Sequence, residues 1–151
     1  MKILGIGSNY VSDLKDLEEK RKAKKFIFSK PESSLAVNCD VVYPSDITNE
    51  LIYEIELVIK IGNGAAPISS FKSIAEYPNL DDINFDLKIN GEEKQRSNTA
   101  YMINDFADII VFISKYMTLQ PGDLIFTGTP ALGKGEIFKG DHLQCSINGE
   151  L

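Results

Sequence analysis

Cysteine and long apolar runs are scarce in this sequence, and each shortage excludes a class of protein. The two cysteines, Cys39 and Cys145, lack the spacing of a metal site and cannot define a disulfide framework. No apolar stretch is long enough to span a bilayer, and the run after Lys2 is too short for a signal peptide. We therefore expect a cytoplasmic protein with reduced thiols and no membrane association.

Basic residues are too scattered to form a surface for nucleic acid. The net charge is −6, and the one basic cluster lies between Lys20 and Lys25. An acidic chain without a broad basic face is a poor ligand for a phosphate backbone, so we expect no nucleic-acid partner. The sequence has no repeats, and its 151 residues, 43% of them hydrophobic, correspond to one globular domain.

Many short strand patterns and a few helical ones follow one another along the chain. Strand patterns occupy 2–6, 26–28, 40–43, 51–61, 83–89, 92–96, 124–126 and 142–147, and helical patterns occupy 12–24 and 102–117. Asn90-Gly91 predicts a two-residue hairpin turn between two of these strands. This order of elements predicts an α+β fold rich in strands, not a doubly wound parallel sheet.

Two glutamates, Glu54 and Glu56, interrupt the apolar pattern of the predicted 51–61 strand. Alternate residues of a strand share a face, so both carboxylates point to one side while Ile55 and Leu57 point to the other. Adjacent like charges repel, and a hard divalent cation such as Mg²⁺, Mn²⁺ or Ca²⁺ would relieve the repulsion. The alternative is a solvated strand face with Lys or Arg on the neighbouring strand.

A second motif is the segment PGDLIFTGTP at 121–130, in which a turn leads into a short apolar strand and then a loop. Glycine permits unusual backbone angles in such a loop. The hydroxyl of Thr129 and nearby backbone N–H groups can therefore bind a small anion. Taken alone, the segment also fits an ordinary surface turn.

In this order, the segments resemble the small members of the fumarylacetoacetate hydrolase family. The matching segments are KILGIGSNY at 2–10, FIFSKPESSL at 26–35, YEIELVIKIG at 53–62, GAAPISSF at 64–71, NGEEKQRSNTAYM at 90–102 and GDLIFTGTP at 122–130. The resemblance runs nearly from end to end and implies a single catalytic domain over 1–151. It also implies a β-sandwich roll of mixed sheets with a few helices, and a homodimer.

The resemblance implies a function as well. Members of this family bind Mg²⁺, or sometimes Mn²⁺ or Ca²⁺, and act on small 2-oxo, diketo or enol acids as hydrolases, lyases or isomerases. The bound metal stabilises the enolate that forms when a C–C or C–H bond breaks. Glu54 and Glu56 would then be metal ligands. The substrate-binding residues that the resemblance implies are Thr129, as a carboxylate contact, together with Tyr10, Gln95 and Asn98.

The chain departs from the family at the catalytic base. The family's Arg-Asn-Tyr-x-x-His-x-x-Glu motif reads SNY at 8–10, with Asp13 in place of the His and Asp16 in place of the Glu. Asp13 and Asp16 become the candidate catalytic pair, although an aspartate with a pKa of roughly 3.9 is a weak base near neutrality. This favours decarboxylation or tautomerisation over hydrolysis. The single histidine, His142, is expected to be structural, and residues 13–19 to form a mobile lid, as in relatives.

A second departure is an internal segment that is absent at about 62–65. In relatives this segment carries the third metal ligand, an Asp, and a Lys near the substrate. Either the protein is shortened there, or residues of the natural chain are missing from the sequence. The survival of the other motifs favours missing residues. Two alternatives to an enzyme stay open. One is a relative that binds metal and a keto acid without hydrolysis, and the other is a structural dimerisation domain with the glutamates paired to Lys60, Lys88 or Lys94.

Overall fold

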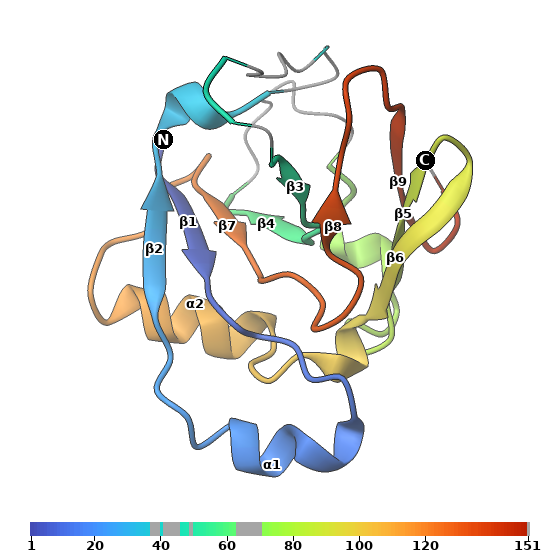
Figure 1. Ribbon diagram of the computed structural model, residues 1–151. Helices are drawn as coiled ribbons and strands as arrows, with labels where there is room; N and C mark the ends of the chain where they lie inside the picture. The colour runs from blue at the N-terminus through green and yellow to red at the C-terminus, as the bar shows by residue number, and fades with distance from the viewer. Residues whose placement is uncertain (37–39, 41–45, 49, 63–70, 151) are drawn as a thin grey trace.

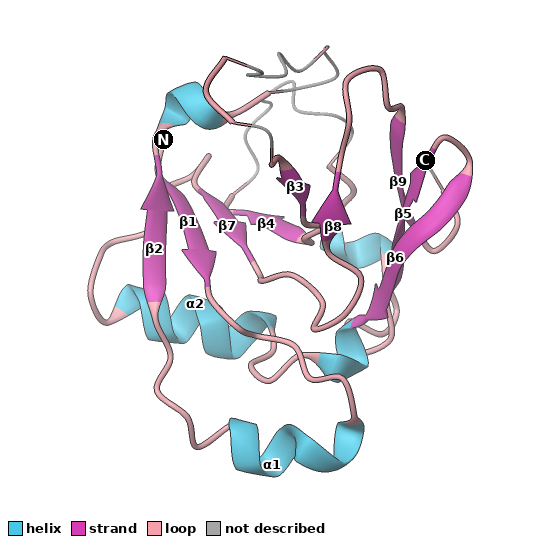
Figure 2. Cartoon of the chain, viewed as in Figure 1, coloured by secondary structure: helices cyan, strands magenta, loops and turns pink. Residues whose placement is uncertain are grey.

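The computed structural model of the protein describes residues 1–36, 40, 46–48, 50–62 and 71–150. In this part of the chain, short strands alternate with a few helices (Figure 2). The predicted α+β architecture of mixed sheets with few helices is confirmed. Cys39, most of the strand predicted at 40–43 and positions 63–65 of the predicted junction lie outside the described residues.

A mixed four-stranded sheet joins strands from distant parts of the sequence (Figure 1). Its strands are β1 (Ile3–Ile6), β2 (Ile27–Lys30), β4 (Val58–Lys60) and β7 (Leu124–Phe126), in the order β2-β1-β7-β4. The central pair, β1 and β7, is parallel, whereas β2 and β4 run antiparallel to their neighbours. The first strand of the chain is therefore completed by a strand from its last quarter.

The other strands form an antiparallel sheet and a separate two-stranded ribbon. The sheet has the order β6-β5-β9, with β5 (Asn84–Ile89), β6 (Glu92–Asn98) and β9 (Leu143–Ile147), and the ribbon pairs β3 (Ile52–Tyr53) with β8 (Gly135–Glu136). Asn90 and Gly91 have φ angles of 54° and 84°. Positive φ at both central residues is typical of the predicted type I′ hairpin turn, which is confirmed.

The helices are short, and the longest covers one face of the four-stranded sheet. They are α1 (Leu17–Lys20), α2 (Phe106–Ser114) and the 3₁₀ helices η1 (Leu14–Asp16), η2 (Glu32–Ser34), η3 (Ile74–Glu76) and η4 (Thr99–Tyr101). The helix predicted over 102–117 begins later, because the Asp105 side chain caps it by accepting the N–H of Asp108 at 2.7 Å. None of the described helices is long and apolar enough to cross a membrane.

The two faces of the four-stranded sheet differ sharply. Leu4 and Ile125 share one core cluster with Ile109 and Ile113 of α2. Alternation along β1 and β7 therefore turns Gly5 and Phe126 to the opposite face. The same argument applies to β2, where Ile27 packs against the core and its neighbours point away. This second face is where the candidate site lies.

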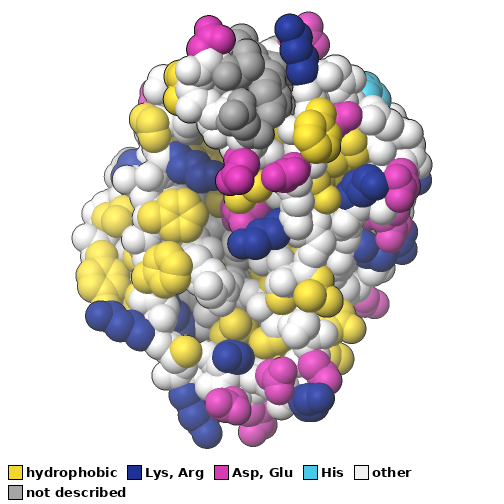
Figure 3. Space-filling model, viewed as in Figure 1, with side chains coloured by type: hydrophobic (Ala, Val, Ile, Leu, Met, Phe, Trp, Pro, Cys, Tyr) yellow, Lys and Arg dark blue, Asp and Glu magenta, His cyan; other side chains and the backbone are white. Residues whose placement is uncertain are grey.

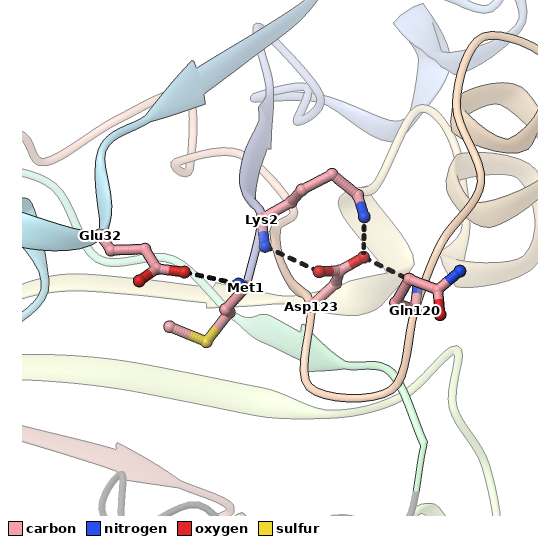
Figure 4. Close-up of polar contacts among 5 residues, drawn as sticks. All are labelled: Met1, Lys2, Glu32, Gln120 and Asp123. Atoms are coloured by element: carbon pink, nitrogen blue, oxygen red, sulfur yellow. Dashed lines mark hydrogen bonds and ion pairs between the residues drawn. The ribbon is translucent and has the colours of Figure 1, made fainter.

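A buried aspartate ties the turn before β7 to the start of the chain (Figure 4). Asp123, 1% exposed, accepts the backbone N–H of Lys2 at 2.7 Å and that of Gln120 at 2.8 Å. The Lys2 ammonium pairs with the same carboxylate at 2.7 Å. Burial opposes ionisation of Asp123, but these donors together hold its pKa below the usual value. The turn that leads into β7 is thus held against the start of the chain.

Candidate functional site

Glu54 and Glu56 lie in a link between two sheets, not within one continuous strand as predicted. β3 pairs with β8, whereas β4 pairs with β7, so the chain changes sheets between them. The predicted alternation nevertheless persists across the link. Ile55 and Leu57 are buried, Glu54 is exposed and Glu56 is half-buried. Both carboxylates therefore point away from the core, as predicted.

Two polar side chains replace the missing ladder contacts of this link. The N–H of Ile55 donates to the Gln95 side-chain oxygen at 2.9 Å. The backbone N–H and the hydroxyl of Thr127 both donate to the carbonyl of Leu57, each at 3.0 Å. Buried backbone groups left without partners are costly, so these contacts fix the path of the link. They also bring it against the loop after β7.

The loop presents a backbone donor to one of the glutamates. The N–H of Gly128 donates to the Glu56 carboxylate at 2.7 Å. Gly128 has a φ of 100°, and a Cβ there would lie 3.0 Å from Asn9 Cβ and 3.1 Å from the Ile6 carbonyl oxygen. Only glycine fits such a position. The backbone path of the loop, and hence the direction of the Gly128 N–H, depends on this glycine.

Burial and charge act on the Glu56 carboxyl in opposite directions. Burial raises its pKa above the usual value, and the charge of Glu54 raises it further. The hydrogen bond from Gly128 and the positive charge of Lys30 oppose this rise. Acidic and basic side chains gather over β3 and β4, near the middle of the face in Figure 3. A cation bound at this pair would favour the ionised carboxylates.

Tyr10 and Asn9 support the loop from the core side. The Tyr10 hydroxyl lies 3.4 Å from the Thr127 hydroxyl, and burial, with a smaller contribution from Glu56, raises its pKa to about 12. Tyr10 is therefore a neutral phenol at physiological pH. Asn9, fully buried, donates to the carbonyls of Thr127 and Asn104 at 2.9 and 3.0 Å. Sequence reasoning missed Asn9 as a site residue, although it lies in the SNY motif.

Gln95 connects the link that carries Glu54 and Glu56 with the PGDLIFTGTP segment at 121–130. Its side-chain nitrogen donates to the Thr129 hydroxyl at 3.2 Å and to the Leu132 carbonyl at 3.1 Å, while its oxygen accepts from Ile55. The side chain is only 2% exposed, so its polar atoms are engaged inside the protein. The structure thus brings Gln95, Thr129, Tyr10 and the glutamates together.

The structure does not bring Asp13 and Asp16 to the glutamates. Asp13 is exposed, caps η1 and pairs with Lys15 at 2.7 Å. The hydrogen bonds from Lys15 lower its pKa, which makes it a weaker base. Asp16 ends η1 and immediately precedes α1, which lies at the lower end of the molecule, apart from β3 and β4 (Figure 1). In this arrangement the candidate catalytic pair is distant from the acidic pair.

Asn98 and His142 make contacts of a structural kind. The Asn98 side chain caps η4 by accepting the N–H of Ala100 at 2.8 Å, and it donates to Asp82 and Asn84. His142 exchanges hydrogen bonds with Asn90 through its backbone. Asn98 is thus held at the end of β6 rather than at the link that carries Glu54.

The acidic pair has two alternative explanations, a metal site and pairing with lysines. Mg²⁺ is commonly held by one or two carboxylates together with water and substrate, and the two glutamates fit this donor set. Among the described residues, no group of three acidic, His or Cys side chains could hold a metal ion. One of the lysines considered, Lys94, pairs instead with Glu92 at 2.6 Å, in a surface hollow of about 350 Å³ beside β3.

Fold and site define a small strand-rich domain in which an acidic pair faces a loop that offers backbone N–H groups. A family model described as "Fumarylacetoacetate (FAA) hydrolase C-terminal" matches residues 63–151, more than half of the chain. An uncharacterized protein of Methanocaldococcus jannaschii is 31% identical over an alignment that covers 98% of this chain and 79% of that protein. The chain belongs to the fumarylacetoacetate hydrolase family.

Two further proteins extend the comparison. Oxaloacetate tautomerase YcgM of Escherichia coli is 26% identical, over 98% of this chain and 89% of its own. The crystal structure of fumarylpyruvate hydrolase from Pseudomonas aeruginosa, in complex with Mn²⁺ and pyruvate, superimposes with a TM-score of 0.79 at 23% identity. That match covers 99% of this chain and 86% of the other, and it shows that the fold is shared.

Proposed function

We propose that the protein is a metal-dependent enzyme that acts on small 2-oxo, diketo or enol acids. The observation that carries the proposal is the contact between Glu56 and the N–H of Gly128, which joins the acidic pair to the Thr-Gly-Thr loop. Family membership supports the same assignment. The E. coli relative is named as an oxaloacetate tautomerase, and the P. aeruginosa enzyme of the same fold holds Mn²⁺ together with pyruvate.

Each residue of the site has a chemical task in this proposal. Glu54 and Glu56 hold Mg²⁺, Mn²⁺ or Ca²⁺. When bound, the cation would chelate the keto acid and stabilise enolate charge. Thr129, half-buried beside the link, offers a hydroxyl to the carboxylate of the substrate. Gln95 holds Thr129 and the link in register, and Tyr10 stays protonated as a neutral donor.

The chain's own residues favour proton transfer or loss of CO₂ over hydrolysis. Hydrolysis requires a base that activates water, and a base is most effective when its pKa lies near the working pH. Asp13, which replaces the family's His, has a pKa below the ordinary value. Tautomerisation and decarboxylation depend more on stabilising the enolate, which the acidic pair and its cation supply. Asp13 and Asp16 remain the candidate residues for proton transfer.

Part of the family's metal site is not among the described residues. The alignment with the M. jannaschii protein runs over 188 residues, more than the 151 of this chain. This supports a segment that the relative has and this sequence lacks, which we place at about 62–65. If the protein itself lacks it, the chain is a binder of metal and keto acid with weakened chemistry. We further propose a cytoplasmic homodimer, as is common in the family.

The test is calorimetric titration of metal-stripped protein with Mg²⁺ and Mn²⁺, with and without oxalate. We expect binding that oxalate strengthens and that Glu54→Ala or Glu56→Ala abolishes. Asp108→Ala, on the exposed surface of α2, is the matched control and should bind as the wild type does. Absence of metal binding in the wild type would overturn the proposal and leave a family fold without its chemistry.

A further inference from the structure

The stretch from Tyr101 to Ile103 holds both ends of the segment 13–19. Val11, which precedes the segment, donates its N–H to the Tyr101 carbonyl at 3.0 Å. Arg21, which follows the segment, donates from its side-chain Nε to the Ile103 carbonyl at 3.1 Å. The candidate catalytic pair lies between these two contacts, so its attachment to the rest of the protein depends on this stretch.

Arg21 uses its guanidinium on a main-chain carbonyl and not on an acid. Within the described part of the chain it takes part in no salt bridge. A charged donor gives a stronger hydrogen bond than a neutral one, so the contact is a specific tether. The adjacent Lys22 is also exposed, and its ammonium contacts none of the described residues. The tether thus belongs to Arg21 and not to the basic cluster as a whole.

Two buried asparagines, Asn9 and Asn104, connect this stretch to the loop after β7. The N–H of Ile103 donates to the Asn9 carbonyl at 2.7 Å. The Asn9 side-chain oxygen accepts the backbone and side-chain N–H groups of Asn104 at 2.9 and 2.8 Å. Its nitrogen donates to the carbonyls of Asn104 and Thr127 at 3.0 and 2.9 Å. All four hydrogen-bonding positions of the Asn9 amide are therefore used inside the protein, and a shift at one end of this buried amide pair breaks contacts at the other.

The loop that the buried amide pair holds also contacts the acidic pair. Thr127 is followed by Gly128, whose N–H donates to the Glu56 carboxylate at 2.7 Å. A Cβ at Gly128 would lie 3.3 Å from the backbone nitrogen of Asn9, so the loop lies directly against Asn9. A continuous series of contacts thus leads from the Arg21 guanidinium to the Glu56 carboxylate.

We propose that Arg21 is a positioning residue that sets the direction of the Glu56 carboxylate through the buried amide pair. This inference rests on the proposed function and adds to it a residue outside the acidic pair. Arg21 acts through these contacts and not by touching the ligand. The segment 13–19 and the acidic pair are then coupled sites, and coupling of binding free energies is reciprocal. Loss of the tether therefore weakens binding at the acidic pair.

The experiment is a double-mutant cycle between Arg21→Met and Asn104→Leu, with Asn104→Ser in place of Asn104→Leu if that variant does not fold. Lys22→Met is the matched control, because it removes the same charge next to the tether. One measured quantity is the exchange rate of the Gly128 amide hydrogen in the ligand-free protein, relative to amides of the β5–β6 hairpin. The other is the dissociation constant of oxalate in saturating Mg²⁺. The exchange rate needs no ligand, so it tests Arg21 separately from the proposed function.

We expect Arg21→Met to speed exchange at Gly128 and to weaken oxalate binding, each roughly fivefold, which is the lower end of the range for coupled sites. Arg21→Met should add little in the Asn104→Leu background, because the series of contacts is already broken there. Lys22→Met should match the wild type.

Two results would overturn the role of Arg21 and leave the proposed function standing. One is an unchanged exchange rate at Gly128 in Arg21→Met, with oxalate bound as in the wild type. The other is a double variant in which the two separate effects simply multiply, since this would show that Arg21 and Asn104 act independently. A wild type that binds no oxalate in Mg²⁺ would overturn the proposed function, and the coupling with it.

Discussion

The backbone N–H of Gly128 donates a hydrogen bond of 2.7 Å to the carboxylate of Glu56, across 72 positions of sequence. Together with the two hydrogen bonds from Thr127 to the carbonyl of Leu57, it joins the acidic link to the loop after β7. The donor can point there because Gly128 has a φ of 100°, a conformation that L side chains rarely adopt. The position of one carboxylate thus depends on a residue without a side chain.

The first prediction concerns this glycine. Gly128→Ala should lower the free energy of unfolding by about 2–4 kcal/mol, because left-handed strain adds to contacts with Asn9 and Ile6. Gly140→Ala is the matched control. Gly140 has a φ of 96° but open space around it, so only strain of about 1 kcal/mol is expected. Urea unfolding measures both, and equal losses in the two variants would contradict a special role for Gly128.

The second prediction concerns Gln95 as a positioning residue. Gln95→Met keeps the length of the side chain but leaves the N–H of Ile55 without its partner. We expect a loss of about 2 kcal/mol in stability and weaker binding of Mg²⁺ with oxalate, because the acidic link is no longer fixed. Gln144→Met, in the half-buried strand β9, is the control. Metal affinity that survives Gln95→Met unchanged would show that the link needs no such support.

The third prediction concerns the buried Asp123. Its pKa lies below the ordinary 3.8, so its ionised form stabilises the fold above that pH, and the contribution disappears as pH falls through the native pKa. Asp123→Asn should cost about 2 kcal/mol at pH 7, and the difference from wild type should shrink below pH 3.8. Lys2→Met keeps the backbone donors and should cost less. A difference that persists at acid pH would contradict this account.

The fourth prediction concerns residues 13–19 as a lid. The segment is anchored at Val11, whose N–H binds the Tyr101 carbonyl, and at Arg21, whose side chain binds the Ile103 carbonyl. Between these anchors, η1 and α1 bury no residue. If the segment closes over bound substrate, its amide hydrogens should exchange more slowly once Mg²⁺ and oxalate are present. Exchange rates that do not change when both ligands are added would exclude closure. The β5–β6 hairpin serves as the internal reference.

Local rules predicted the features that depend on neighbouring residues. The hairpin at Asn90 follows from the backbone freedom of two adjacent residues. The common direction of Glu54 and Glu56 follows from alternation, which persists even where the strand is interrupted. The start of α2 also had a local signal, since Asp105 precedes the helix as a capping residue.

Features that depend on distant partners were not predictable in this way. The strand is interrupted at 54–57 because β3 pairs with β8 whereas β4 pairs with β7. β8 has only two residues and no sequence pattern that would predict it. The internal contacts of Gln95, the burial of Asn9 and the place of Lys30 over Phe126 arise from the same long-range packing. Sequence patterns name such residues but do not assign their contacts.

The parallel pairing of β1 with β7 has a consequence for folding during synthesis on the ribosome. β1 is made before β7, and β2 can join it early, but the other edge of β1 stays unpaired until β7 emerges. The bond between Lys2 and Asp123 closes a loop across 121 positions. Chains with such non-local strand pairing expose unpaired strand edges until the partner strand is made, and they fold slowly. We expect the site to assemble only after β7 has been made and has paired with β1.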